Sequence, residues 1–294
     1  MAHDQSTASE ESTENKSYEL KLSGYFITCF LTSGALLVIE LVAARIIAPY
    51  VGVSLYTWTT IIGVILAGLS IGNWLGGYWA DKGHAEKRVG VVIFGSGLLT
   101  LLSLFLIQPV AAQVQAQDYS LLTSTLIYVL SLFLFPSMAL GVITPMLTTL
   151  AARQSKDMGK IIGGMHAIAA LGSITGVFLT GYILIQYFGS RQVIFGVAIL
   201  LMLLSVPYYF KEKQSIYVSI AAVLLITMVI TAFNYKILFV DICKRESAYY
   251  CINVVDRSED VTFGTAQGLV IDHLLHGINH ATEPGYLVAA FAQA

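Results

Sequence analysis

The sequence predicts a mainly α-helical, polytopic membrane protein with about seven transmembrane helices and a small C-terminal antiparallel β-domain. Its 294 residues are 56% hydrophobic and only 12% charged, whereas soluble domains carry about 25% charged residues. The mean hydropathy is +0.74. Apolar runs long enough to cross a bilayer, which takes roughly 20 residues, follow one another up to residue 234, and short β-prone runs come after them.

The chain divides into a tail, a helical bundle and a β-domain. Residues 1–22 are rich in Ser, Thr, Asn and Glu and can bury little apolar surface, so we expect a disordered cytoplasmic tail. Residues 23–234 form the predicted transmembrane bundle, with apolar segments at 23–48, 57–80, 89–110, 120–150, 161–188, 192–210 and 216–234. The fourth segment is longer than a bilayer requires, and we expect Pro136 and Pro145 to kink it or end it early.

Basic residues indicate the orientation of the bundle. The loops after the second, fourth and sixth segments contain Lys82, Lys87, Arg88, Arg153, Lys156, Lys160, Lys211 and Lys213. The alternate loops contain only Arg191. Because cytoplasmic loops are enriched in Lys and Arg, we expect a multi-pass protein of the cell membrane, with a cytoplasmic N-terminus and a periplasmic or extracellular C-terminal domain.

The C-terminal part, residues 235–294, reads as a small β-meander. Its β-prone runs are Tyr249–Val255, Val261–Phe263 and Leu269–Ile271, and a polar turn occupies residues 256–260. Runs of this length separated by polar turns are typical of short antiparallel strands.

Composition also excludes some classes of function. With 16 Lys and Arg residues spread along the chain and a net charge of -2, the protein lacks the clustered basic face of a nucleic-acid-binding protein. No Cys-x-x-Cys or Cys/His spacing of a metal site occurs. We therefore expect no metal, no cofactor and no nucleic-acid partner.

Glu40 is the strongest candidate for a functional residue in the first segment. It lies near the middle of the expected span, where a charged group costs about 2.5–3.5 kcal/mol. Five residues separate it from Arg45, which places the two about 140° apart on a helix rather than in an i, i+4 pair. Glu40 is either a structural hydrogen-bonding residue or part of a substrate or proton path, and Arg45 reads as an interface anchor.

Two further polar residues lie inside predicted helices. His166 in the fifth segment could relay protons near neutral pH, although a lone intramembrane histidine is more often a packing residue. Asn73 in the second segment is a weaker candidate for a functional residue.

Glycines recur at spacings near four in two segments. Such spacing lets helix backbones approach closely in a membrane, so these glycines read first as packing faces. They are Gly63, Gly68, Gly72, Gly76 and Gly77 in the second segment, and Gly163, Gly164, Gly172, Gly176 and Gly181 in the fifth.

Cys243 and Cys251 could form a disulfide if they lie outside the cytoplasm. Eight residues of straight strand would hold them about 26 Å apart, so a bridge requires a turn between them. Cys29 lies alone in the first segment.

Several motifs resemble known membrane proteins. The loop at residues 77–84 (GYWADKGH) and the run from 171 to 191 are similar to major facilitator transporters. The block at residues 34–52, with Ser54 and Trp58, resembles bacterial proteins in which half a facilitator-like bundle is fused to a spermidine synthase domain. The runs at 246–254 and 269–277 resemble the N-terminal β-domain of spermidine synthases. The resemblance implies an inner-membrane protein and covers about residues 24–294.

The resemblance also implies what this chain lacks. The family binds its aminopropyl donor with a Rossmann-like domain, and the given chain ends before the Gly-rich turn of such a domain. The family's substrate-side positions correspond to Tyr249, Tyr250, Asp272 and His276, but Tyr250 replaces a usual Gln and His276 stands where the family's Asp-Gly-x-x-Gln element has Gln. As given, the polypeptide is not expected to transfer aminopropyl groups.

Three hypotheses about function remain open. The first is a non-catalytic membrane subunit, or degenerate homologue, that docks a partner protein or a second copy through its β-domain. The second is one part of a membrane-anchored polyamine aminopropyltransferase. The third is a transporter of a small cation or polyamine with Glu40 as the binding carboxylate, which would need a dimer because half a facilitator bundle has no symmetric half to rock against.

Overall fold

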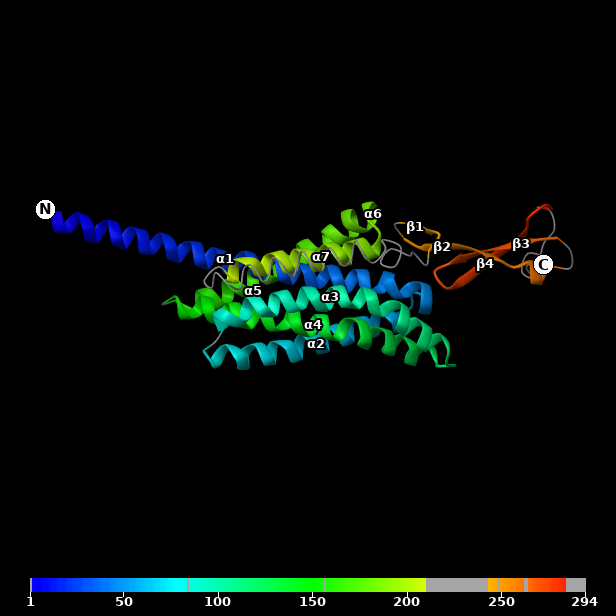
Figure 1. Cartoon of the computed structure of the whole chain (residues 1–294), viewed down its shortest axis with the longest axis horizontal. Coiled ribbons are helices and arrows are strands. Elements are labelled where there is room, and N and C mark those ends of the chain that lie inside the picture. The colour runs from blue at the N-terminus through cyan, green and yellow to red at the C-terminus, as the bar shows by residue number, and fades with distance from the viewer. Residues whose placement is uncertain are drawn as a thin grey trace.

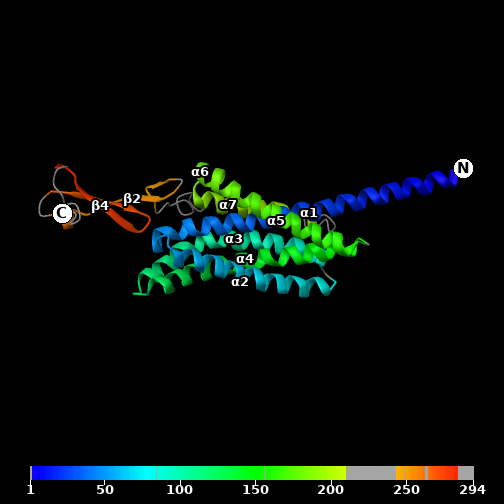
Figure 2. The ribbon, with the colours of Figure 1, turned by 180° about the vertical axis from the view of Figure 1, so that it is seen from behind.

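The computed structural model is a bundle of long helices with a small sheet beyond one end (Figure 1). It describes residues 2–83, 85–155, 157–209, 243–247, 249–261 and 264–283. The view from behind shows the same arrangement, with the N-terminal part of the first helix extending from the end opposite the sheet (Figure 2).

Long helices dominate the described chain. They are α1 (Ala2–Val51), α2 (Leu55–Asp81), α3 (Ala85–Gln115), α4 (Leu121–Arg153), α5 (Met158–Leu179) and α7 (Ser190–Ser205), with the short η1 (Thr180–Leu184), α6 (Ile185–Tyr187) and η2 (Val206–Tyr209). Six apolar stretches of these helices are long enough to cross a membrane. The described helices are therefore compatible with a multi-pass membrane protein. The expected seventh segment, residues 216–234, lies outside the described residues.

Helix α1 differs from the expectation for the N-terminus. It begins at Ala2, so residues 2–22 are helical instead of forming the expected disordered tail. A physical reason is that lengthening an existing helix requires no new nucleus, since each added residue forms one hydrogen bond on the turn already present.

Helix α4 runs without interruption through both of its prolines. It spans 33 residues and contains Pro136 and Pro145, so the expected early end is wrong. A proline in a bundle helix is tolerated where neighbouring helices support the backbone around it. Pro145 lies directly against Gly76 of α2, at the place where a Cβ on that glycine would overlap the proline ring.

Close backbone packing confirms one part of the glycine prediction and corrects another. A Cβ on Gly68, Gly72 or Gly76 would overlap α4, and one on Gly172 or Gly176 would overlap α1. A Cβ on Gly164 would come within 3.1 Å of the Phe26 ring. The other glycines of the predicted faces have no neighbouring atom within 4 Å of such a Cβ; they are Gly63, Gly77, Gly163 and Gly181. Spacing alone did not distinguish the two groups because it does not tell which side of a helix meets a partner.

The sheet has four antiparallel strands in the order β1-β2-β3-β4. They are β1 (Arg245–Glu246), β2 (Cys251–Asp256), β3 (Ala266–Ile271) and β4 (Leu274–His280). This is the expected meander, although the run expected at Val261–Phe263 is not a strand where it is described, since Val261 lies in a bend after a short helical turn. Strand β4 was not predicted because its Gly, Asn and His residues weaken the β-strand signal, and pairing with β3 supplies its hydrogen bonds.

Local hydrogen bonds shape the turns of the sheet. After β2, the Ser258 hydroxyl and backbone N–H donate to the Asp256 carboxylate, and these bonds hold the pKa of Asp256 below its ordinary value. Between β3 and β4, Asp272 adopts a left-handed conformation with φ of 54°, which Asp tolerates better than most residues. The turn presents Asp272 and His273 toward the helical bundle.

Candidate functional site

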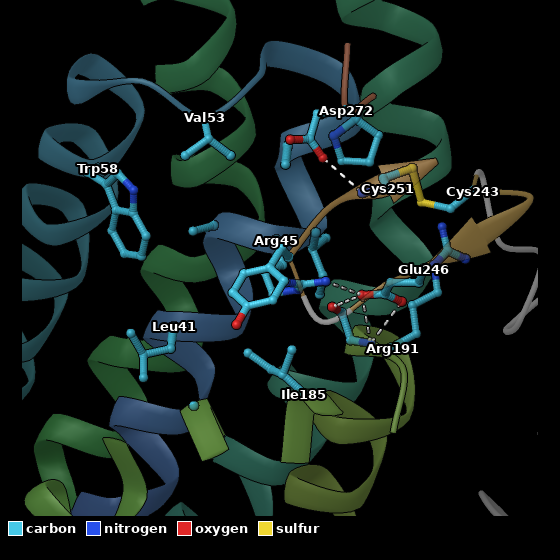
Figure 3. A pocket seen from close by; sticks show the side chains of 17 residues that line it. Leu41, Arg45, Val53, Trp58, Ile185, Arg191, Cys243, Glu246, Cys251 and Asp272 are labelled. Carbon is cyan, nitrogen blue, oxygen red and sulfur yellow. Dashed lines mark hydrogen bonds and ion pairs between the residues drawn. A yellow bond between two sulfur atoms is a disulfide. The ribbon is translucent and has the colours of Figure 1, made fainter. Parts of the chain in front are cut away.

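The sheet meets the bundle at a junction formed by β1 and the β3–β4 turn on one side and the ends of α1 and α7 on the other (Figure 3). A pocket of about 270 Å³ lies there. Its lining includes two cationic and two anionic side chains, Arg45, Arg191, Glu246 and Asp272. Most of the remaining lining is apolar and comes from both parts of the molecule.

Glu246 of β1 is the central residue of this junction. Its carboxylate accepts hydrogen bonds from the Ser190 backbone N–H, at 3.3 and 3.2 Å to its two oxygens, and from the Ser190 hydroxyl. Ser190 is the first residue of α7. A carboxylate at this position satisfies a free N–H group of the helix terminus and interacts favourably with the helix dipole.

Arg45 of α1 completes the contact from the other side. Its Nη2 lies 3.4 Å from Glu246 Oε1 and donates a 2.6 Å hydrogen bond to the carbonyl of Ser247. The two charged side chains are 16% and 22% exposed, so water screens the pair less than it would at an open surface. One carboxylate therefore joins the sheet to both α1 and α7.

A second contact lies on the loop between α1 and α2. Gly52 has a φ of +72°, and a Cβ on it would lie 2.6 Å from Nδ1 of His273. A larger residue at Gly52 would be strained at this φ and would require the exposed His273 side chain of the β3–β4 turn to move. The same turn is bonded to β2, since Asp272 Oδ1 accepts from the Cys251 N–H at 3.0 Å and the Cys251 carbonyl accepts from the Asp272 N–H at 2.8 Å.

Cys243 and Cys251 form a disulfide with their Cα atoms 5.3 Å apart. The turn that a bridge requires is present, because Glu246 pairs with Cys251 at the end of β1 and the chain reverses between them. The bond encloses Glu246 within its loop. It therefore helps to hold the junction residue in place.

We expect replacement of both cysteines by serine to destabilise the sheet by about 2.5 kcal/mol, the loop-closure contribution of an eight-residue loop. Thermal unfolding of the variant and of the oxidised protein would measure the difference. Peptide mapping with and without reductant provides the chemical check. Two free thiols in protein prepared natively without reductant would contradict the assignment.

Among the residues predicted from sequence, Arg45 lies at the junction, whereas Glu40 does not. Glu40 is half-buried and lines neither the junction pocket nor the polar cavity deeper in the bundle. Within the described part of the chain, its carboxylate has no hydrogen bond or ion pair. Glu40 and Arg45 lie about 140° apart around the axis of α1. They therefore meet different neighbours.

Asn73 and His166 come together elsewhere. Both line a cavity of about 640 Å³ between α1, α2, α4 and α5, away from the sheet. The sequence does not indicate this shared cavity, because nothing in the spacing along the chain relates a residue of α2 to one of α5.

Three of the four positions taken from the spermidine synthase resemblance lie at or beside the junction pocket. Tyr249 and Asp272 line the junction pocket. Tyr250 is exposed, and the exposed His276 places Nδ1 3.0 Å from the carbonyl of Leu274 in its own strand. The Tyr250 ring lies next to that of Tyr249, with the ring centroids 6.3 Å apart.

Glu246 and Ser190 were not predicted as site residues. Glu246 stands within a run quoted for the resemblance, and Ser190 begins a helix just after a glycine. The sequence signal was a single acidic residue, Glu246, where the chain changes from apolar to polar residues. Such a residue does not indicate which group it will contact. No group of three or more His, Cys, Asp or Glu side chains that could hold a metal ion occurs among the described residues.

No known protein family, curated protein or solved structure matches this chain.

Proposed function

We propose that this protein is a non-catalytic integral membrane subunit that presents its β-sheet to a partner outside the bilayer. The observation that carries the proposal is the attachment of Glu246 to Arg45 and to the first residue of α7. This contact holds one end of the sheet against the helical bundle. A sheet fixed in this way is suited to docking.

The faces of the sheet support a docking role. On one face, Ile252, Ile271 and Leu274 are aligned across three strands, and Leu274 is 58% exposed. On the other face, Val255 and Leu275 are also exposed. Among the described residues of the sheet, only Cys251, Ala266, Gly268 and His280 are buried. An apolar surface of this kind commonly marks an interaction site.

The partner that we propose is a Rossmann-like domain with an apolar docking surface. It is the domain that the resemblance to membrane-bound spermidine synthases places next to such a sheet. In the proposed subunit this partner is a separate protein. In the alternative it is a further part of the same polypeptide, which would then be an aminopropyltransferase. The reading frame after Ala294 distinguishes these two, because a strand followed by Gly-x-Gly-x-Gly would indicate the second.

Chemical crosslinking in native membranes, followed by mass spectrometry, tests the docking role. We expect crosslinks from the lysines nearest the sheet, such as Lys244, to a Rossmann-like domain, and we expect Leu274→Asp to abolish them. Tyr119→Asp is the matched control, since Tyr119 is an exposed apolar residue in the α3–α4 loop, outside the sheet. Crosslinks that persist in the Leu274 variant, or a sheet with no partner at all, would refute the proposal.

A further inference from the structure

The cavity that contains Asn73 and His166 lies in the half of the bundle away from the sheet. Asn73 is about two helical turns from the end of α2, and His166 is about two turns from the start of α5. The cavity has a volume of about 640 Å³, which is within the range of small-molecule sites, roughly 300–1,000 Å³. It is separate from the junction pocket and shares no lining residue with it.

The lining is polar but carries no fixed charge. Of its 15 residues, none is Asp, Glu, Lys or Arg. The polar members come from all four helices and are Thr32, Ser33, Asn73, Thr144, Thr148, Thr149, His166 and Ser173. A concentration of polar side chains at membrane depth indicates a water-filled or ligand-filled space, because such groups are costly against lipid.

Several of the hydroxyl groups already donate hydrogen bonds to backbone carbonyls. Thr32 donates to the carbonyl of Thr28 at 2.9 Å and Thr148 to the carbonyl of Thr144 at 2.8 Å, both within their own helices. Ser173 donates to the Ser33 carbonyl at 3.4 Å. These hydroxyls therefore offer acceptor lone pairs to the cavity rather than donors.

Asn73 and His166 supply the donors. Neither side chain forms a hydrogen bond with another residue in the part of the chain that the structure describes, and both are exposed to the space around them. The Asn73 amide offers two donors and an acceptor, and a neutral His166 ring offers one of each. Asn73 and His166 thus add donors from α2 and α5 to a lining in which several hydroxyl groups can only accept.

We propose that this cavity binds a small uncharged solute with several hydroxyl groups, such as a polyol or a monosaccharide. Hydroxyl groups both donate and accept, which matches a lining of amide, imidazole and hydroxyl groups. A polyamine or metal cation fits poorly because the lining contains no carboxylate, and Glu40 lies outside it. An anion lacks a Lys or Arg partner. The inference does not depend on what docks on the sheet.

Saturation-transfer difference NMR tests this proposal on the full chain in phosphatidylcholine nanodiscs, prepared without glycoside detergents. The probes are D-glucose, glycerol, spermidine and inorganic phosphate. We expect a signal from at least one uncharged probe, and we expect Asn73→Leu and His166→Phe each to weaken its apparent affinity about tenfold. Asn279→Leu and His276→Phe, the same exchanges at exposed positions of β4, are the matched controls.

A third variant keeps the test decisive if either polar residue is needed for folding. Ala170→Phe fills the cavity from α5 without removing a polar group, and it should reduce the same signal. The proposal is overturned if no uncharged probe gives a signal that is reduced both by Ala170→Phe and by whichever of Asn73→Leu and His166→Phe folds. It is also overturned if spermidine or phosphate is the probe whose signal depends on Asn73.

Discussion

Gly72→Ala is expected to lower the free energy of unfolding of the bundle by about 3 kcal/mol, the upper part of the usual range for overpacking a core. A Cβ at this position would overlap the Met138 carbonyl of α4 and lie 3.0 Å from the Cα of Gly141. Both obstacles are backbone atoms, which cannot rotate away as a side chain can. The two helices would have to separate along their contact.

Gly63→Ala is the matched control on the same helix. No atom lies within 4 Å of a Cβ at Gly63, so we expect no destabilisation and a gain of up to about 1 kcal/mol from the higher helix propensity of Ala. Unfolding by heat or by denaturing detergent, followed by the fluorescence of the tryptophans on α2, compares the two variants. Equal stability of the Gly72 and Gly63 variants would show that α2 and α4 do not pack as described.

Glu246→Ala has the second large expected effect, a loss of about 2 kcal/mol, because the largely buried Arg45 guanidinium loses the carboxylate that offsets its charge. The Ser190 N–H would lose its acceptor at the same time. Hydrogen exchange in β1 and β2 should accelerate, while exchange in α2 and α4 stays unchanged. Loss of protection throughout the bundle would instead indicate general unfolding.

A double-mutant cycle separates the ion pair from the capping of α7. We expect Glu246→Ala and Arg45→Met to show a coupling energy of about 1.5 kcal/mol, at the low end for close charge pairs. Glu259→Gln is the control, since Glu259 lies exposed in the turn after β2, and it should leave stability and exchange unchanged. A coupling energy near zero would mean that Arg45 does not hold the sheet.

Much of the architecture was predictable because it follows from local patterns. Apolar length predicted the helices, since a bilayer-spanning segment must satisfy its backbone within itself. Short β-prone runs between polar turns predicted an antiparallel sheet. Strand β4 and the helical start of α1 were missed, because pairing with a neighbour and extension of an existing helix can override local composition.

The candidate site was predictable only in part. Arg45, Asn73 and His166 were singled out because polar residues are rare in apolar segments. What they contact could not be predicted. Arg45 contacts Glu246, 201 residues further along the chain. No local sequence pattern relates two residues so far apart.

The sequence by itself therefore determined that this protein is built from apolar helices followed by a small sheet, because each pattern depends on neighbouring residues alone. Only the tertiary structure decided which glycines pack, that Glu246 joins the sheet to α1 and α7, and that Asn73 and His166 share a cavity from which Glu40 is absent. These are contacts between distant segments. Their energies depend on the direction in which each helix presents its side chains, which a linear spacing does not specify.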